Sequence, residues 1–208
     1  MKPGISNKIL ARYVTKVLTS YRETEEYLPD RKTKTTGTPV RREINSDERS
    51  PTGKSFGLKP DSPIILVFGG SQGSRVLIEK TISEIEERGD TESLPYQFLI
   101  QTGSTNYSAF AGRVESLGTD RVQLIEYIED MGSAYRMSDL VICRGGAGTM
   151  AELVATKTPA IIVPWSGASE NHQYFNGKYL ADNGAALLVE EGDWPGFPLF
   201  DELSGLFP

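Results

Sequence analysis

The sequence is short of cysteine, histidine and long apolar runs, and each shortage excludes a class of protein. Its 208 residues include one cysteine, Cys143, which excludes an internal disulfide bond and indicates a reducing compartment. The one histidine, His172, has no further ligands at metal-binding spacing, and the chain lacks an Asp-x-Asp pair that would clamp a diphosphate through a divalent cation. We therefore expect no metal centre and no cofactor.

The chain also lacks the signals that direct a protein across or into a membrane. No apolar run approaches the roughly 20 residues that a bilayer-spanning helix needs. The first residues do not have the charged-then-apolar layout of a signal peptide. The expected location is the cytoplasm, with peripheral contact at the inner face of the cell membrane left open.

The net charge of −6 is unevenly distributed. Residues 1–58 hold 12 Lys and Arg against 7 Asp and Glu, which gives +5, whereas the remainder holds 10 against 21, which gives −11. An acidic main body argues against a nucleic-acid partner. The basic N-terminal part would suit an anionic membrane surface, although an ordinary solvated face accounts for any one of its charges.

From Pro63 onward, short apolar runs alternate with segments of helical spacing. The expected strands are Ile64–Phe68, Gln97–Gln101, Val122–Tyr127, Leu140–Cys143, Ala160–Val163 and Ala185–Val189. The expected helices are Ser74–Glu87, Tyr107–Leu117, Met131–Met137, Thr149–Thr156 and Asn171–Asn183. This alternation predicts an α/β fold, a Rossmann-like parallel sheet with helices on both faces. Such a sheet binds ligands outside the carboxyl ends of its strands.

The N-terminal part is less regular. Apolar residues at helical spacing predict a helix over residues 5–18, and the run Lys16–Tyr21 fits a strand as an alternative. Residues 43–60 are polar and rich in helix breakers, which predicts a linker or loop.

The most informative segment is Asp139–Glu152, in which an apolar strand leads into a Gly/Ala/Thr loop and then a helix. Backbone N–H groups at a helix N-terminus bind phosphate, and the carboxylate of Glu152 can accept hydrogen bonds from sugar hydroxyls. Taken alone, glycines that serve packing and a glutamate that complements the helix dipole explain this segment equally well.

Another glycine loop, Gly69-Gly-Ser-Gln-Gly-Ser-Arg75, lies earlier in the chain, directly after the first of the regular strands. Its glycines do not have the spacing of the dinucleotide fingerprint, and a tight turn explains them about as well as a phosphate loop does. The side-chain donors of Ser71 and Gln72 favour phosphate contact. Two such loops on one sheet indicate a nucleotide or nucleotide-sugar site.

Three further polar residues are candidates for the same site. Gln173 and Asn176 lie one turn apart and could bind sugar hydroxyls from one helix face, although Gln173 with His172 also fits an ordinary helix start. Arg41 follows a Gly-Thr-Pro-Val turn. It is either one more solvated arginine or, if it faces a diphosphate, a source of strong charge-assisted hydrogen bonds.

Taken together, five ordered segments resemble the MurG family of bacterial cell-wall glycosyltransferases, which belong to the two-domain GT-B class. They are Gly37-Thr-Pro-Val-Arg41, Gly69-Gly-Ser-Gln-Gly-Ser-Arg75, Tyr127-Ile-Glu-Asp-Met131, Cys143-Arg-Gly-Gly-Ala-Gly-Thr-Met-Ala-Glu152 and His172-Gln-Tyr-Phe-Asn176. The resemblance covers nearly the whole chain up to about Glu191. It implies transfer of N-acetylglucosamine from UDP-GlcNAc to a lipid-linked muramoyl peptide, the lipid I to lipid II step of peptidoglycan synthesis.

The resemblance also implies a role for each candidate residue. Arg41 and Ser71 would contact the diphosphate, the backbone of Ile128 would read the uracil edge, Glu152 would hold the ribose, and Gln173 with Asn176 would hold the GlcNAc hydroxyls. The helix N-terminus would contact a phosphate. The implied binding residues are Arg41, Ser71, Gln72, Ile128, Ala147, Gly148, Thr149, Met150, Ala151, Glu152, Gln173 and Asn176.

The chain departs from the family pattern because it has no counterpart of the family's N-terminal domain, which carries the acceptor site and the candidate general base. We expect residues 1–42 to be a remnant of that domain with its connection, 43–60 a linker, and 61–208 a donor-binding domain that diverges after about residue 191. Ile100 stands where the family commonly has histidine, and Thr38 replaces a usual asparagine. No catalytic residue is assigned.

The expected function is therefore UDP-GlcNAc binding without sugar transfer by this chain alone. The chain is expected to be either a truncated gene product or a subunit that a separate acceptor-domain chain completes. The lipid-linked muramoyl peptide would be a substrate only if the acceptor half is supplied. The alternatives are a non-catalytic nucleotide-sugar-binding subunit or remnant, and a GT-B relative that uses another UDP-sugar.

Overall fold

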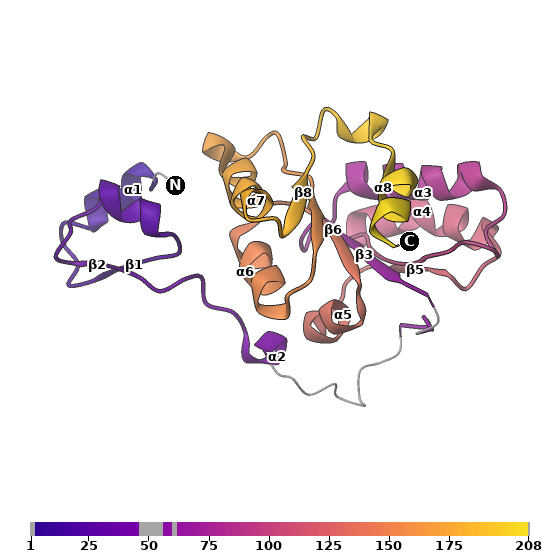
Figure 1. Ribbon diagram of the computed structural model, residues 1–208, viewed down its shortest axis with the longest axis horizontal. Coiled ribbons are helices and arrows are strands. Elements are labelled where there is room, and N and C mark those ends of the chain that lie inside the picture. The colour runs from indigo at the N-terminus through magenta and orange to yellow at the C-terminus, as the bar shows by residue number, and fades with distance from the viewer. Residues whose placement is uncertain (1–2, 46–55, 60–61, 208) are drawn as a thin grey trace. The chain divides into compact units, whose positions relative to one another are not determined.

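The computed structural model describes residues 3–45, 56–59 and 62–207. The chain divides into two compact units, Met1–Val40 and Arg41–Pro208. Figure 1 labels most of the helices and strands of both units.

The smaller unit contains two short parallel strands and two short helical segments. Its elements are α1 (Ile5–Leu10), β1 (Val17–Thr19), the 3-10 helix η1 (Arg22–Tyr27) and β2 (Thr33–Thr35). The helix predicted over residues 5–18 is wrong beyond Leu10, and β1 falls within the alternative strand Lys16–Tyr21. The reason is local, because β-branched Val14, Thr15 and Val17 favour extended backbone over helix.

The larger unit is built on a six-stranded parallel sheet with the strand order β5-β4-β3-β6-β7-β8. The strands are β3 (Ile64–Phe68), β4 (Gln97–Gln101), β5 (Val122–Ile125), β6 (Leu140–Cys143), β7 (Ala160–Ile162) and β8 (Ala186–Leu188). The central strands β3, β4 and β6 are buried along their whole length, as expected for a sheet covered on both faces.

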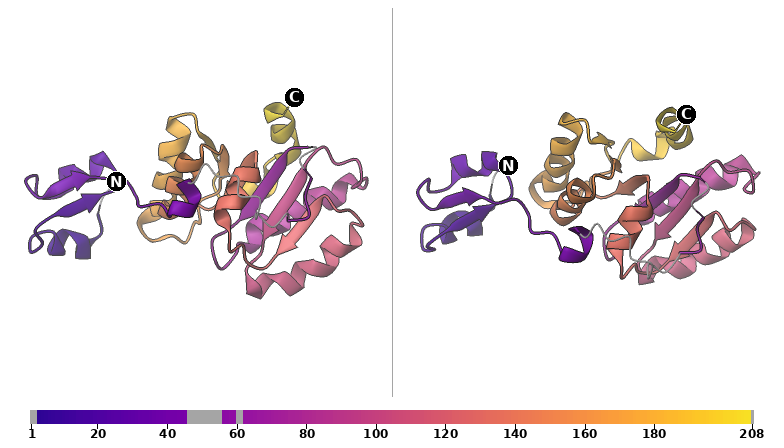
Figure 2. Two further views of the ribbon diagram at one scale, coloured as in Figure 1. Left: turned by 90° about the horizontal axis from the view of Figure 1, so that it is seen from below. Right: turned by 60° about the horizontal axis from the view of Figure 1, so that its bottom comes forward.

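Helices cover both faces of this sheet, which confirms the predicted fold class (Figure 2). On one face, α3 (Arg75–Arg88), α4 (Ser104–Ser116) and α8 (Leu199–Leu206) contribute to a continuous apolar core. The other face meets α5 (Met131–Met137), α6 (Ala147–Thr156) and α7 (His172–Asp182). There the rings of Phe68 and Tyr135 pack edge to face, 6.1 Å apart, and Gly177 of α7 lies against Ile162 and Leu188.

The C-terminal segment is part of the core. Trp194 opens the 3-10 helix η3 (Trp194–Gly196) and stacks on Phe197 with 5.4 Å between ring centroids. Leu199, Phe200 and Leu203 of α8 are buried beside it. A sequence that does not resemble the expected closing helices therefore still closes the hydrophobic core.

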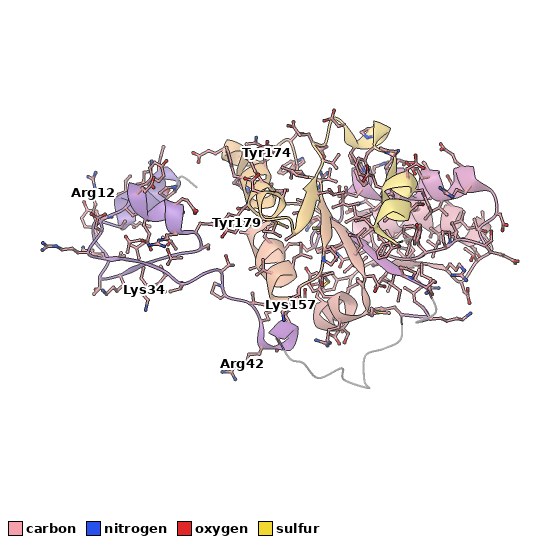
Figure 3. All side chains as sticks on the ribbon, in the orientation of Figure 1. Arg12, Lys34, Arg42, Lys157, Tyr174 and Tyr179 are labelled. Carbon is pink, nitrogen blue, oxygen red and sulfur yellow. The ribbon has the colours of Figure 1, made fainter. Side chains whose placement is uncertain are left out.

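The segment expected to be a linker begins as a helix. The short helix α2 (Arg42–Asn45) packs on α5 and α6, with Ile44 buried. The backbone carbonyl of Glu43 accepts a hydrogen bond from Arg136 Nη1 at 3.0 Å. Figure 3 labels Arg42, whose side chain is exposed. Residues 46–55 and 60 of the expected linker lie outside the described residues.

The strand order reverses direction between β3 and β6, and this reversal positions the candidate site. The chain runs from β3 outward to β4 and β5, and then returns to place β6 on the other side of β3. Phe68 pairs with Cys143 at the carboxyl end of these strands. The two glycine loops therefore start side by side, at the topological switch point where α/β sheets bind ligands.

We predict that Asp130→Ala lowers the free energy of unfolding by about 1 kcal/mol, because Asp130 caps α5. Its carboxylate accepts hydrogen bonds from Ser133 N at 2.9 Å and Ser133 Oγ at 2.6 Å. These hydrogen bonds lower the pKa of Asp130 below its usual value. Urea denaturation at neutral pH checks the loss, and Asp130→Asn, which keeps an acceptor oxygen, should lose less.

The same cap predicts a pH dependence. Since the folded-state pKa of Asp130 is lowered, its contribution is present above the pKa of the unfolded state and is lost as pH falls through the folded-state pKa. The difference between wild type and Asp130→Ala should therefore shrink in acid. A difference that is constant from neutral pH into acid would contradict the role of the ionised carboxylate.

Candidate functional site

The first glycine loop, Gly69–Gly73, is clamped against the end of β4. Gly73 has φ +73°, and a Cβ built there would lie 1.7 Å from the carbonyl oxygen of Thr102. Only glycine fits such a position without displacing backbone. Ser71 and Gln72 lie on the exposed side of this loop. The predicted donors, the side chains of Ser71 and Gln72, are thus exposed to solvent, and the backbone that carries them is packed against Thr102.

Gln101 holds this loop from inside, and its contribution was not predicted. It is 3% exposed, donates from Nε2 to Gly70 O at 2.9 Å, and accepts at Oε1 from the backbone N–H of Ile128 at 3.2 Å. One buried amide therefore ties the first glycine loop to the segment after β5. A polar residue at the carboxyl end of a buried strand is the sequence signal that could have revealed it.

The second glycine loop, Arg144–Gly146, packs against the start of α7. A Cβ at Gly145 would lie 2.2 Å from the carbonyl oxygen of Gln173. Asn176 is 1% exposed and donates from Nδ2 to Gly145 O at 2.9 Å. The structure therefore brings Gln173 and Asn176 to the second loop, where the amide nitrogen of Asn176 is already used to hold that loop.

The N-terminus of α6 carries its first backbone N–H groups at the end of this loop. Gly146 is the N-cap residue and has no side chain to cap them, and among the described residues no side chain does so. Ala147 and Gly148 are exposed, and Thr149 is half-buried. An uncapped helix N-terminus offers hydrogen-bond donors and partial positive charge to an anion.

The carboxylate of Glu152 is held by two side chains. Oε2 accepts a hydrogen bond from the hydroxyl of Tyr135 at 3.0 Å, and Oε1 lies 3.3 Å from Nη2 of Arg41. Tyr135 is 1% exposed, and burial together with the Glu152 charge raises its pKa far above the usual value. The phenol therefore remains a donor. Tyr135 was missed because nothing in the sequence connects it with Glu152.

The side-chain amide of Gln173 has a defined orientation. Its Oε1 accepts the backbone N–H of Trp165 at 3.0 Å. Because a backbone N–H can only donate, the amide oxygen must face Trp165, and the amide nitrogen is turned away from it. His172, at the first position of α7, is exposed and has Nδ1 2.6 Å from Ser169 O.

Two predicted residues have little to offer a ligand directly. Met150 is 1% exposed, and its N–H donates to Gly146 O at 2.9 Å. Ile128 is also 1% exposed, and its N–H, expected to read a base, donates to Gln101. Ala151 is half-buried on α6. Ile100 lies in the apolar core and not in the site.

Within the described residues, no three His, Cys, Asp or Glu side chains gather in a group that could hold a metal ion. The part of the chain that the structure describes also contains no helix of sufficient length and apolar character to cross a bilayer.

The parallel sheet and its two glycine loops define a Rossmann-like α/β domain of the kind found in GT-B glycosyltransferases. The sequence profile of the glycosyltransferase family 28 C-terminal domain matches residues 64–207. The chain therefore belongs to glycosyltransferase family 28. This match extends beyond residue 191, where the resemblance by motifs ends.

Two similar curated proteins carry the name UDP-N-acetylglucosamine--N-acetylmuramyl-(pentapeptide) pyrophosphoryl-undecaprenol N-acetylglucosamine transferase. The protein from Acetivibrio thermocellus is 33% identical over 205 residues, and that from Elusimicrobium minutum is 37% identical over 209 residues. These alignments cover 98% and 99% of this chain and 55% of each relative. The chain thus spans about half the length of the curated relatives it matches.

Solved structures show the same fold. MurG from Acinetobacter baumannii is 27% identical, with a TM-score of 0.72 over 97% of this chain and 55% of that one. The UDP-GlcNAc 2-epimerase from Neisseria meningitidis bound to UDP-GlcNAc is 13% identical, with a TM-score of 0.63 over 94% of this chain and 54% of the epimerase. The second likeness shows the fold alone. The resemblance to the MurG family is confirmed.

We predict a coupling energy of about 1 kcal/mol between Tyr135 and Glu152 in the free energy of unfolding. Tyr135→Phe keeps the ring packed on Phe68 and removes only the hydroxyl donor. A double-mutant cycle of Tyr135→Phe and Glu152→Ala, followed by urea denaturation, measures the coupling. Strictly additive losses would show that the hydroxyl does not hold the carboxylate.

Proposed function

We propose that the larger unit binds UDP-GlcNAc and acts as the donor half of a lipid-linked GlcNAc transferase. The observation that carries this proposal is the grouping around α6: an uncapped helix N-terminus, a carboxylate fixed by Tyr135, and a guanidinium within reach of that carboxylate. The curated relatives are named as UDP-GlcNAc transferases, which supports this substrate.

The diphosphate is proposed to lie across the first turn of α6, with the N–H groups of Ala147, Gly148 and Thr149 as donors. Ser71 and Gln72 face it from the other glycine loop. When the sugar is transferred, the departing UDP gains negative charge. Fixed N–H donors and a nearby arginine stabilise that charge without rearrangement, which lowers the barrier.

Arg41 is proposed to exchange partners when the nucleotide binds. Its side chain is 56% exposed and that of Glu152 is 17% exposed, so their ion pair is close to solvent. Such exposed pairs contribute only about 0–1 kcal/mol, so little stability is lost when Arg41 leaves Glu152 for the diphosphate. The exchange leaves one oxygen of Glu152 available to the ribose.

The base and the sugar are proposed to lie on opposite sides of this diphosphate. The uracil is proposed to lie at the segment around Ile128, where the N–H of Ile128 itself already donates to Gln101. Gln173 is proposed to bind GlcNAc hydroxyls through its amide nitrogen. Met150, Ala151 and Asn176 are proposed to support the loop and helix that carry these contacts.

Sugar transfer is proposed to require the part of the relatives' length that does not align with this chain, on the same polypeptide or another. In the smaller unit, Ile5, Ile9 and Leu10 of α1 are 73%, 53% and 57% exposed, and Tyr13 is 82% exposed. Parallel strands such as β1 and β2 are normally buried on both faces. These features support an acceptor-binding partner domain for the smaller unit, with the lipid-linked muramoyl peptide as the acceptor.

The working location is proposed to be the cytoplasm, at the inner face of the cell membrane. Arg12 and Lys34, labelled in Figure 3, are exposed cations of the smaller unit. Anionic lipids attract each such cation by about 1 kcal/mol. This attraction would suit an enzyme half whose acceptor is held in the membrane.

We predict that UDP-GlcNAc binds more tightly than UDP-galactose or GDP-mannose when the whole chain is titrated by isothermal calorimetry. UDP-GlcNAc meets the predicted contacts for uracil, ribose, diphosphate and sugar, whereas UDP-galactose alters the sugar and GDP-mannose alters both the base and the sugar. No heat with any uridine nucleotide would refute the proposal. Tighter binding of UDP-galactose would favour a relative with another donor.

We predict that Glu152→Ala weakens UDP-GlcNAc binding by about 1–3 kcal/mol, because the ribose hydroxyls lose a charged acceptor. Calorimetry on the folded variant gives the change in affinity. Glu115→Ala, which removes an exposed carboxylate from α4, is the matched control and should bind like the wild type. Equal affinities for all three proteins would show that Glu152 does not bind the ribose.

A further inference from the structure

A second ion pair lies at the carboxyl edge of the sheet, on the side of α7. Arg144 belongs to the second glycine loop, and Glu191 follows β8. Their side chains are only 11% and 15% exposed, and Arg144 Nη2 donates a hydrogen bond to Glu191 Oε1. Although burial raises it, hydrogen bonds from Ser166 and Arg144 lower the pKa of Glu191 overall. The ionised form of Glu191 is therefore favoured beside the guanidinium of Arg144.

Both members of this pair also fix the chain that follows β7. Arg144 Nη1 donates to Val163 O at 3.1 Å. Glu191 Oε2 accepts from the backbone N–H of Ser166 at 2.9 Å and from its hydroxyl at 2.5 Å. The segment from Val163 to Ser166 is thus held at both of its ends. Trp165, the residue before Ser166, lies within it.

This segment in turn orients Gln173, because the N–H of Trp165 fixes the amide oxygen of Gln173 at 3.0 Å. Gln173 Nε2 has no partner among the described residues. Its backbone is also confined, since Gly145 approaches its carbonyl closely. The free end of the amide is a donor, which suits acceptor oxygens on a sugar ring or its N-acetyl group.

We propose that Arg144 and Glu191 are positioning residues that set sugar specificity by fixing the amide of Gln173 through the segment Val163–Ser166. The inference rests on the proposed binding of UDP-GlcNAc. It adds to that proposal a role for an ion pair that need not contact the nucleotide. An ordinary structural pair would change stability without changing the choice between ligands.

The test compares UDP-GlcNAc with UDP by calorimetry on the whole chain. Each protein yields a ratio of the dissociation constants for UDP and UDP-GlcNAc, which isolates the contribution of the sugar. Gln173→Ala should lower the affinity for UDP-GlcNAc and leave that for UDP unchanged. Glu191→Gln places an amide against the guanidinium of Arg144 and should shift the ratio in the same direction, by about fivefold.

The decisive measurement is the double variant of Glu191→Gln and Gln173→Ala. If Glu191 acts through Gln173, the double variant has the ratio of Gln173→Ala alone, because no oriented amide remains to be lost. Independent, additive shifts would overturn the inference. So would an unchanged ratio in Glu191→Gln while Gln173→Ala loses its sugar contribution.

Two further variants keep the test decisive. Asp182→Asn breaks the exposed ion pair with Lys178 on the same helix and should leave the ratio unchanged. If Glu191→Gln fails to fold, Ser166→Ala removes one hydrogen bond to Glu191 and should give a smaller shift in the same direction. A wild-type chain without affinity for UDP-GlcNAc would refute the proposed function and this inference together, whereas the outcomes above refute the inference alone.

Discussion

The pairing of β3 with β6 is the constraint on which the rest of the site depends. It places Phe68 beside Cys143, so that two glycine loops distant in the sequence leave the sheet as neighbours. Each loop then turns into a helix, α3 or α6, on opposite faces of the sheet. The topology makes this edge the expected position for a ligand, whereas the choice of ligand depends on the side chains around it.

Buried amides hold these loops because a loop cannot use the sheet ladder for its own polar groups. Gln101 links the first loop to the backbone after β5, and Asn176 links the second loop to α7. A buried carbonyl without a partner costs about 1–3 kcal/mol. Both amides therefore stabilise a loop conformation that would be unfavourable without them. Their removal would disturb the site before it disturbed the core.

Much of the larger unit could be predicted from the sequence, since apolar runs bounded by loops identify buried strands. β3, β4 and β6 have the predicted bounds.

The predicted helix starts were less accurate than the predicted strands. α4 begins at Ser104 and α6 at Ala147, ahead of the predicted Tyr107 and Thr149. Both follow a glycine N-cap, which supplies no capping side chain to recognise. The bond from Tyr135 to Glu152 could not be predicted, because it depends on how α5 packs against α6.

The two ion pairs around the site differ in exposure to solvent, and this difference determines whether the arginine can change its partner. The pair of Arg41 with Glu152 lies near water, where an arginine can leave one anion for another at small cost. The pair of Arg144 with Glu191 is largely withdrawn from water, where separating the charges would leave each without compensation. In the proposed UDP-GlcNAc site, the diphosphate would recruit Arg41 while Arg144 stays in place. The pair of Arg41 with Glu152 would then supply a movable contact, and the pair of Arg144 with Glu191 a fixed support for Gln173.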